Sequence, residues 1–165
     1  MDLYKWYAVY TRSRQEKKVA EHLQKYGYTV YLPLIKTIRQ WSDRKQKVEI
    51  PLISSYVFVN VSERDYYSIL NTPGVVKYVT FDGKAAPIPE NQILAMKMAV
   101  DNNLEIEITN ETIEPGEMVK VVSGPIKGAE GELIRLVHKR NFLIRLNNIG
   151  FSLLLEVNAG DVIKL

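Results

Sequence analysis

The glycine-rich stretch VKVVSGPIKGAEGELIRL, residues 119–136, is the part of the sequence whose residue types and spacing first suggest chemistry. Such loops can cradle a phosphate with backbone N–H groups, and a Walker-type loop needs G-x-x-x-x-G-K-[ST] leading into a helix. Here Glu132 follows Gly131, so neither a lysine nor a hydroxyl stands where a phosphate needs it. The residues that follow predict a strand rather than a helix. The stretch therefore does not predict a nucleotide site.

A tight turn between two β-rich runs accounts for the same residues. Gly124 and Gly128 can adopt a positive φ because they lack a Cβ atom, and Pro125 restricts the chain between them. Together with Gly131, these residues predict the turn of a small barrel.

The rest of the sequence lacks the residue sets that catalysis or metal binding needs. It contains no cysteine and only two histidines, which excludes a disulfide framework and a thiolate metal site. Neither a Ser-His-Asp set nor a metal cluster is recognisable, so we predict a protein that is not an enzyme and has no cofactor. The charged amino terminus and the lack of an 18-residue apolar run predict a cytoplasmic protein without a membrane span. We also expect a monomer.

Charge is distributed unevenly along the chain. Residues 1–100 carry a net charge of +6 and residues 101–165 a net charge of −3, and the basic residues concentrate before position 48. This asymmetry predicts a polyanion, such as a nucleic acid, as a partner of the first part. The alternative is a solvated basic surface without a partner.

The elements that must position these residues differ between the two parts. In residues 1–100 the apolar patterns predict the order β-α-β-β-α-β-α, which corresponds to an antiparallel sheet with helices on one side, an α+β fold. Residues 36–50 predict an exposed hairpin or long loop. The expected strands and helices cover residues 5–11, 12–27, 28–35, 56–61, 63–71, 75–81 and 89–100.

The second part predicts a different architecture. Residues 101–114 contain five acids and no base, and we interpret them as an acidic linker. Residues 115–165 predict a separate domain of five short strands, for which a small, partly closed β-barrel buries the apolar residues without exposed edges. The expected strands cover residues 117–123, 130–138, 141–147, 152–157 and 161–165.

Several quoted stretches resemble one known family. Residues 114–136, EPGEMVKVVSGPIKGAEGELIRL, resemble a KOW motif, the glycine-bearing hairpin of small SH3-like barrels. KWYAVYTRSRQEKKVAEHL (5–23), PLISSYVFVNV (51–61) and NTPGVVKYV (71–79) occur in the order and spacing of the NusG amino-terminal domain. The basic stretch 11–23 is most similar to specialised RfaH-like paralogues of this family. The resemblance covers essentially the whole chain.

The resemblance implies RNA polymerase as the main partner. In the family, an aromatic and apolar patch of the amino-terminal domain binds the β′ clamp helices of the polymerase. The family has Phe-Pro-Gly or a close variant before the tyrosine, whereas this chain has Ile53, Ser54 and Ser55. The alternative is that these rings belong to the core of the domain. We assign Trp6 and Val57 to that core. By position, the patch consists of Tyr10, Ile53, Tyr56, Phe58 and Phe81.

The resemblance also implies a contact with the displaced non-template DNA strand. Lys18, His22 and Lys25 fall on one helical face by their spacing, and Arg12 and Arg14 precede that helix. Cations placed along a helix suit the phosphates of a single strand. The alternative is an exposed basic face. The contact of RfaH-like paralogues with the polymerase gate loop uses His-Thr-Thr, where this chain has residues 66–68, Tyr-Tyr-Ser.

The KOW domain of the family recruits a further partner, either termination factor Rho or a ribosomal protein. A loop phenylalanine is important for both, and Ile149 and Phe151 stand near that place here. We predict a transcription elongation and antitermination factor that promotes readthrough of specific long operons, of the polysaccharide type. The alternatives are the housekeeping NusG factor and a KOW-type RNA- or ribosome-binding protein without a polymerase role.

Overall fold

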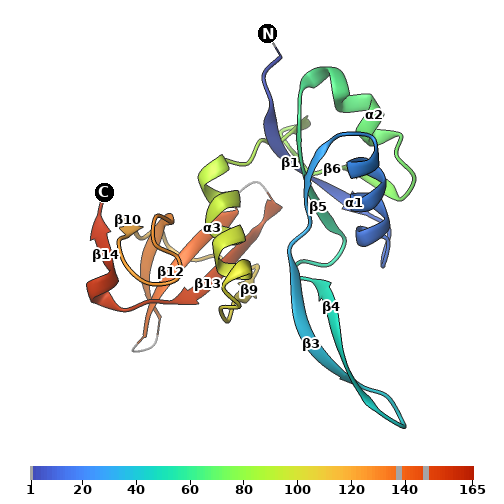
Figure 1. The fold of residues 1–165 in the computed structure, drawn as a ribbon. Coiled ribbons are helices and arrows are strands. Elements are labelled where there is room, and N and C mark those ends of the chain that lie inside the picture. The colour runs from blue at the N-terminus through green and yellow to red at the C-terminus, as the bar shows by residue number, and fades with distance from the viewer. Residues whose placement is uncertain (1, 137–138, 147–148) are drawn as a thin grey trace. The chain divides into compact units, whose positions relative to one another are not determined.

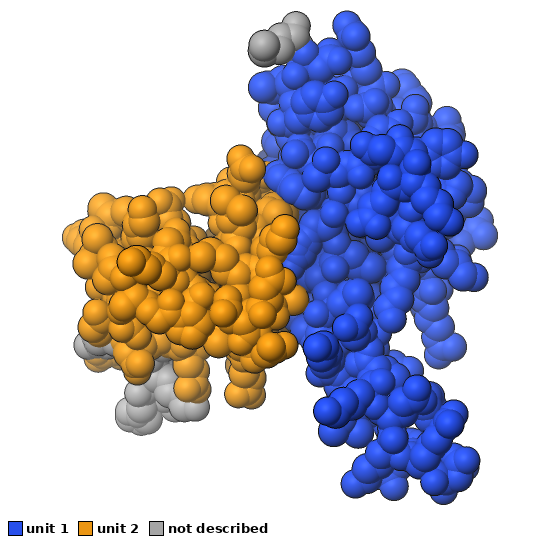
Figure 2. All heavy atoms as spheres, viewed as in Figure 1, with its two compact units in different colours: residues 1–87 blue, residues 88–165 orange. Residues whose placement is uncertain are grey.

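The computed structural model describes residues 2–136, 139–146 and 149–165 of the chain. The chain divides into two compact units, residues 1–87 and residues 88–165 (Figure 2). Within the described residues, no helix has both the length and the apolar composition that crossing a bilayer requires.

Unit 1 is built on a four-stranded antiparallel sheet in the order β2-β5-β1-β6 (Figure 1). This is the antiparallel sheet with helices that the sequence predicted. The elements of unit 1 are β1 (Lys5–Thr11), α1 (Glu16–Lys25), β2 (Thr29–Tyr31), β3 (Leu34–Gln40), β4 (Lys45–Pro51), β5 (Tyr56–Val61), the 3-10 helix η1 (Glu63–Asp65), α2 (Tyr66–Leu70), β6 (Val75–Tyr78), β7 (Thr80–Phe81) and β8 (Lys84–Ala85).

Alternation along β5 gives the sheet two different faces. Val57, Val59 and Val61 are almost fully buried in one cluster with Leu23 of α1 and Ile69 of α2. Successive side chains of a strand point to opposite faces, so the residues between these valines point away from the two helices. Helices α1 and α2 therefore cover one face of the sheet. The opposite face, which carries Tyr56 and Phe58 and is free of these two helices, is called the helix-free face below.

The segment predicted as a strand at 28–35 is two strands. Pro33 separates β2 from β3 because proline has no N–H to donate to a ladder, and its carbonyl oxygen accepts a hydrogen bond from the Leu52 N–H at 2.8 Å. Strands β3 and β4 then form a hairpin, which confirms the exposed hairpin expected over 36–50. At its tip the Trp41 N–H donates to the Arg44 carbonyl oxygen at 2.8 Å.

A side-chain cap starts the helical segment after β5. Asp65 Oδ2 accepts hydrogen bonds from the backbone N–H of Ser62 at 3.2 Å and from its hydroxyl at 3.0 Å. This capping box satisfies a donor that a helix start leaves unpaired. Ser62, a residue type favoured at helix starts, is therefore the N-cap of η1.

Unit 2 is a six-stranded antiparallel sheet in the order β14-β10-β11-β12-β13-β9. The five strands expected after residue 115 are present, with the ends of two of them outside the described residues. The elements of unit 2 are α3 (Glu90–Asp101), β9 (Glu107–Thr109), β10 (Glu117–Val121), β11 (Glu130–Leu136), β12 (Lys139–Leu146), β13 (Phe151–Glu156), the 3-10 helix η3 (Ala159–Asp161) and β14 (Val162–Lys164).

A closed barrel is not found in unit 2. The edge strands β14 and β9 do not pair with each other within the residues that the structure describes. Helix α3 packs against β11 and β12 and buries Ile93, Met96 and Ala99. A helix therefore covers apolar surface that the sequence analysis assigned to barrel closure.

The compact units also differ from the domains expected at 1–100, 101–114 and 115–165. Helix α3 belongs to unit 2, and β9 lies inside the segment interpreted as a linker, where it pairs with β13. Ile108 of β9 stands opposite Leu153 in this ladder. Isoleucine is a residue type that favours strands, so this part of the acidic segment is able to pair with β13. The functional domain limits stay a prediction.

Gly131 is a point of close packing in unit 2 and provides a stability test. An ideal Cβ there would lie 2.6 Å from Phe142 Cζ and 2.7 Å from the Leu143 carbonyl oxygen. We expect Gly131→Ala to destabilise unit 2 by about 1–3 kcal/mol, because overpacking forces neighbours out of position. At Gly160 a Cβ would meet nothing within 4 Å, so Gly160→Ala should change stability by less than about 0.5 kcal/mol. Urea unfolding followed at unit 2 amides checks both, and equal effects would contradict the assignment.

Candidate functional site

The predicted rings Tyr10 and Tyr56 lie together on the helix-free face. They stand opposite each other in the β1–β5 ladder, and their ring centroids are 4.8 Å apart with a tilt of 51°. Burial, the larger cause, and a hydrogen bond with Tyr10, the smaller one, raise the pKa of Tyr56 above its usual range. The Lys77 ammonium lies 5.4 Å from the centroid of the Tyr10 ring, a cation–π contact that the sequence analysis missed.

Phe58 continues this group toward the neighbouring strand. Its ring meets that of Tyr31 edge-on, with centroids 6.4 Å apart. Tyr31 lies opposite Phe58 in the β2–β5 ladder, a pairing that the sequence could not reveal because β2 follows a separate turn. Trp6, which the sequence analysis assigned to the core, is half-buried on the same face, opposite Asn60.

The other two residues of the predicted patch have different surroundings. Ile53 precedes β5 and is 4% exposed, whereas Phe81 lies in β7, which forms a separate two-stranded sheet with β8, and is 68% exposed. In the whole chain Tyr56 is 8% exposed and Phe58 is fully buried. Of the five, only the described surfaces of Tyr10 and Phe81 are accessible to a partner, whereas Ile53, Tyr56 and Phe58 are enclosed. The assignment of the five residues to a polymerase contact stays a prediction.

The loop before β5 has a strained residue that α1 holds in place. Ser55 has a φ of +66°, a region that favours glycine, and it stands where the resemblance expects glycine. The buried carboxylate of Glu16 accepts a hydrogen bond from the Ser55 N–H at 2.9 Å. The Ser55 carbonyl oxygen in turn accepts from the Thr11 N–H at 2.9 Å. These two bonds fix the approach to Tyr56, so the chain keeps the turn without the glycine.

The predicted DNA-binding residues surround the start and one side of α1. Arg12, Arg14, Lys18 and Lys25 are exposed, and His22 is half-buried against the Tyr26 ring at 4.8 Å. The structure therefore brings the five predicted residues onto one helix and the turn before it. Whether they contact DNA stays a prediction.

Two local contacts shape this basic surface. Lys25 forms an ion pair with Glu21 at 3.5 Å, but both side chains are largely exposed, so the pair contributes little. Arg14 has a φ of +62°, and the Arg12 N–H donates to the Gly74 carbonyl oxygen at 2.9 Å. The turn that carries the two arginines is thereby attached to the start of β6.

A lysine that the sequence analysis did not single out links α1 to the hairpin. Lys17 Nζ donates to the Glu49 carbonyl oxygen of β4 at 2.7 Å. At the tip of this hairpin the Arg44 guanidinium lies 5.4 Å from the centroid of Trp41, whose side chain is 43% exposed. The bond joins residues 32 positions apart, so no local pattern in the sequence could have indicated it.

The glycine turn of unit 2 has the predicted conformation. Gly124 and Gly128 have φ values of +88° and +97°, and the Lys127 N–H donates to the Gly124 carbonyl oxygen at 3.2 Å, with Pro125 inside that turn. Strand β11 follows, as expected. Gly131 differs from the other two glycines because it lies within β11, where its role is the close approach to Phe142.

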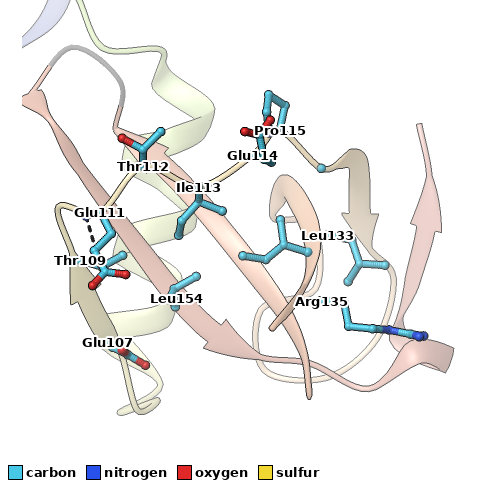
Figure 3. A pocket seen from close by; sticks show the side chains of 12 residues that line it. Glu107, Thr109, Glu111, Thr112, Ile113, Glu114, Pro115, Leu133, Arg135 and Leu154 are labelled. Carbon is cyan, nitrogen blue, oxygen red and sulfur yellow. Dashed lines mark hydrogen bonds between the residues drawn. The ribbon is translucent and has the colours of Figure 1, made fainter. Parts of the chain in front are cut away.

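Ile149 and Phe151, the predicted partner contact of unit 2, lie around the start of β13. Ile149 is 6% exposed and Phe151 is half-buried. A separate groove of about 530 Å³ lies between the segment 107–116 and strands β11 and β13 (Figure 3), and neither residue lines it. Ile113 packs there against a cluster that includes Leu154.

An ion pair attaches the segment beside this groove to the sheet. Arg145 Nε and Glu132 Oε2 are 2.7 Å apart, and Arg145 Nη1 donates to the Ile113 carbonyl oxygen at 3.0 Å. Glu132 Oε1 also accepts from the Gly116 N–H at 3.0 Å. The hydrogen bond with Glu132 raises the pKa of Arg145 further above its usual range. The ion pair and these hydrogen bonds hold the segment that leads into β10.

Comparison with known proteins identifies the family. A family model described as "Transcription termination factor nusG" matches residues 4–97. Two transcription termination/antitermination proteins NusG are similar along their lengths. The one from Streptococcus pyogenes serotype M3 is 25% identical over 97% of this chain and 96% of the relative. The one from Rickettsia felis is 24% identical over 96% of this chain and 89% of the relative.

Among solved structures, one titled "Domain interaction in Thermotoga maritima NusG" is similar, with a TM-score of 0.49 and 21% identity over 99% of this chain and 98% of that chain. The family model covers more than half of the residues of the chain. The chain therefore belongs to the NusG family of transcription termination factors.

Proposed function

We propose that this protein is a non-enzymatic transcription elongation and antitermination factor that binds the β′ clamp helices of RNA polymerase. The observation that carries the proposal is the ring pair of Tyr10 and Tyr56 on the helix-free face of the sheet. Aromatic side chains that lose water on binding make good interface anchors. Family membership supports the same partner.

A second feature of this face supports a partner there. The amide oxygen of Asn60, which alternates with Val59 and Val61 and so points to the helix-free side, is buried and has no hydrogen-bond partner in the described part of the chain. Leaving such a group unpaired costs about 1–3 kcal/mol. A donor from a bound partner would remove this cost if binding uncovered the oxygen, whereas a purely structural face would retain it.

Binding to one conformation of the polymerase is sufficient for the proposed activity. A factor that binds the elongating state more tightly than the paused state shifts the population toward elongation by its differential affinity. No bond needs to be made or broken by the factor itself. The size of its effect on transcription is then limited by the free energy with which this face binds the polymerase.

The double change Tyr56→Ala and Phe58→Ala should abolish polymerase capture in a pull-down with the full chain, because both rings leave the proposed interface. Phe58 is fully buried, so circular dichroism and amide spectra must confirm that unit 1 folds. Phe81→Ala, at a 68% exposed site, should fold normally and weaken binding by about tenfold, as for a hot-spot ring.

Val76→Ala is the matched control for Phe81→Ala. Val76 is 53% exposed in the neighbouring strand β6 but is outside the proposed patch, so its removal should leave polymerase binding unchanged. Full binding by a folded double variant, or equal losses for Phe81→Ala and Val76→Ala, would refute the proposed contact.

We also propose that the basic surface of α1 and its preceding turn contacts displaced single-stranded DNA. The supporting observation is the exposure of Arg12, Arg14, Lys18 and Lys25 around one helix. The bond from Lys17 to Glu49 joins this helix to the basic β3–β4 hairpin, which extends the cationic surface toward Trp41. DNA phosphates that bind to such a surface release their counterions, so the affinity must fall as the salt concentration rises.

The affinity for a single-stranded oligonucleotide should fall linearly with salt on logarithmic axes. Lys18→Ala should weaken binding to different sequences about equally and lower the slope by about 0.7, as for one lost phosphate contact. Lys127→Ala, an exposed lysine of the unit 2 turn, should leave the slope unchanged. Fluorescence anisotropy at several salt concentrations measures both, and a salt-independent affinity would exclude the DNA contact.

For unit 2 we propose a KOW-type role in recruiting Rho or a ribosomal protein, with Ile149 and Phe151 at the contact. The support is the glycine turn, in which Gly124 and Gly128 have positive φ values. An RNA- or ribosome-binding protein without a polymerase role is the competing function. Under that alternative, unit 2 residues alone would govern partner binding, and the ring variants would be without effect.

Within the family, we propose a specialised, RfaH-like antiterminator of long operons rather than the housekeeping factor. The support is the basic turn and helix over residues 11–23. Transcript mapping after deletion of the gene should show reduced readthrough in one or a few long operons. A loss of readthrough across the genome would instead assign the housekeeping role.

A further inference from the structure

A cavity of about 520 Å³ lies in unit 1 at the start of β1, away from the ring pair on the helix-free face. Its volume is in the range of small-ligand sites. It is bordered by the end of β5, the first turn of α2 and the β7–β8 hairpin, and four tyrosines contribute to its wall: Tyr7, Tyr66, Tyr67 and Tyr78.

Three of these tyrosines form a fixed aromatic floor. The rings of Tyr66 and Tyr78 are stacked, with centroids 4.4 Å apart and planes at 8°, and Tyr7 meets Tyr78 edge-on at 6.0 Å. Tyr78 is 2% exposed, and its hydroxyl donates to the Tyr66 carbonyl oxygen at 3.2 Å. The floor is therefore part of the folded body and does not need a ligand to hold it.

Tyr67 at the rim differs from the floor. Its ring is 71% exposed and meets the Tyr66 ring nearly at a right angle, with centroids 5.2 Å apart. A ring so exposed contributes little to the core, and one face of it is available to a planar ligand. Base–aromatic stacking on such rings is a common means of binding single strands.

The charged residues of the wall favour an anion. Lys5 and Lys84 are exposed and line the cavity, together with the single carboxylate of Glu63. Neither lysine pairs with a carboxylate in the described part of the chain. Lysine ammonium groups bind phosphate as point charges, so the wall combines two exposed lysines with an exposed ring.

We propose that this tyrosine cavity binds one nucleotide of a single-stranded nucleic acid, with the base against Tyr67 and the phosphate near Lys5 and Lys84. The site is distinct from the α1 surface, because Lys5 and Arg12 lie at the beginning and just past the end of β1. An acidic protein segment is the other ligand that two lysines could attract, and the experiment separates the two.

The test is an amide NMR titration of the full chain with adenosine monophosphate, short oligouridylate, short oligothymidylate and a poly-glutamate peptide. We expect the nucleotides to change the amide chemical shifts of Gly83, Lys84 and Ala85. The oligonucleotide that binds more tightly will identify the ligand as RNA or DNA. Shifts with poly-glutamate and none with any nucleotide would overturn the proposal.

Variants give a second readout. Tyr67→Ala should weaken nucleotide binding roughly 5- to 100-fold, as for a lost stacking ring, and its exposure makes a folding defect unexpected. Tyr4→Ala removes a ring that is 60% exposed and outside the wall, so it should leave the affinity unchanged. Unchanged affinity for Tyr67→Ala, or shifts confined to α1 amides, would also overturn the proposal.

Discussion

The alternation of side chains along β5 is the constraint on which the rest of unit 1 depends. Val57, Val59 and Val61 pack against α1 and α2, and because a strand repeats every two residues, Tyr56 and Phe58 must point the other way. The antiparallel register with β1 then places Tyr10 beside Tyr56. One strand thus specifies both the core under α1 and α2 and the helix-free face with its rings. A shift of the strand register by one residue would exchange the two faces.

The loop before β5 couples this face to the basic helix. Glu16, in the first turn of α1, holds the strained Ser55 through its N–H, and Ser55 directly precedes Tyr56. Positive φ at a non-glycine residue costs of order 1 kcal/mol, and the hydrogen bond offsets this cost. The same helix carries Lys18 and Lys25 on its exposed side. The proposed polymerase and DNA contacts are therefore positioned by one small structural unit.

Local patterns predicted the elements that depend on local physics. The strand over residues 5–11 and the positive φ of Gly124 follow from residue type and periodicity, and the structure has both. Contacts between distant residues were not predictable. The pairing of β9 with β13 and the ion pair of Arg145 with Glu132 join segments with no shared pattern. A closed barrel is not found in the described residues, and α3 covers β11 and β12 instead. No pattern in residues 89–100 indicated that this helix packs on those strands.

Site-specific crosslinking in a transcribing complex tests the central claim most directly, because it reports which face of the sheet touches the polymerase. A photo-reactive phenylalanine derivative would replace Tyr10 on the ring-bearing face and, separately, Val76, which is 53% exposed and alternates with Lys77. We predict crosslinks to the β′ subunit from position 10 and none from position 76. Crosslinks from position 76 alone, or none from position 10 in a complex that contains the factor, would contradict the account.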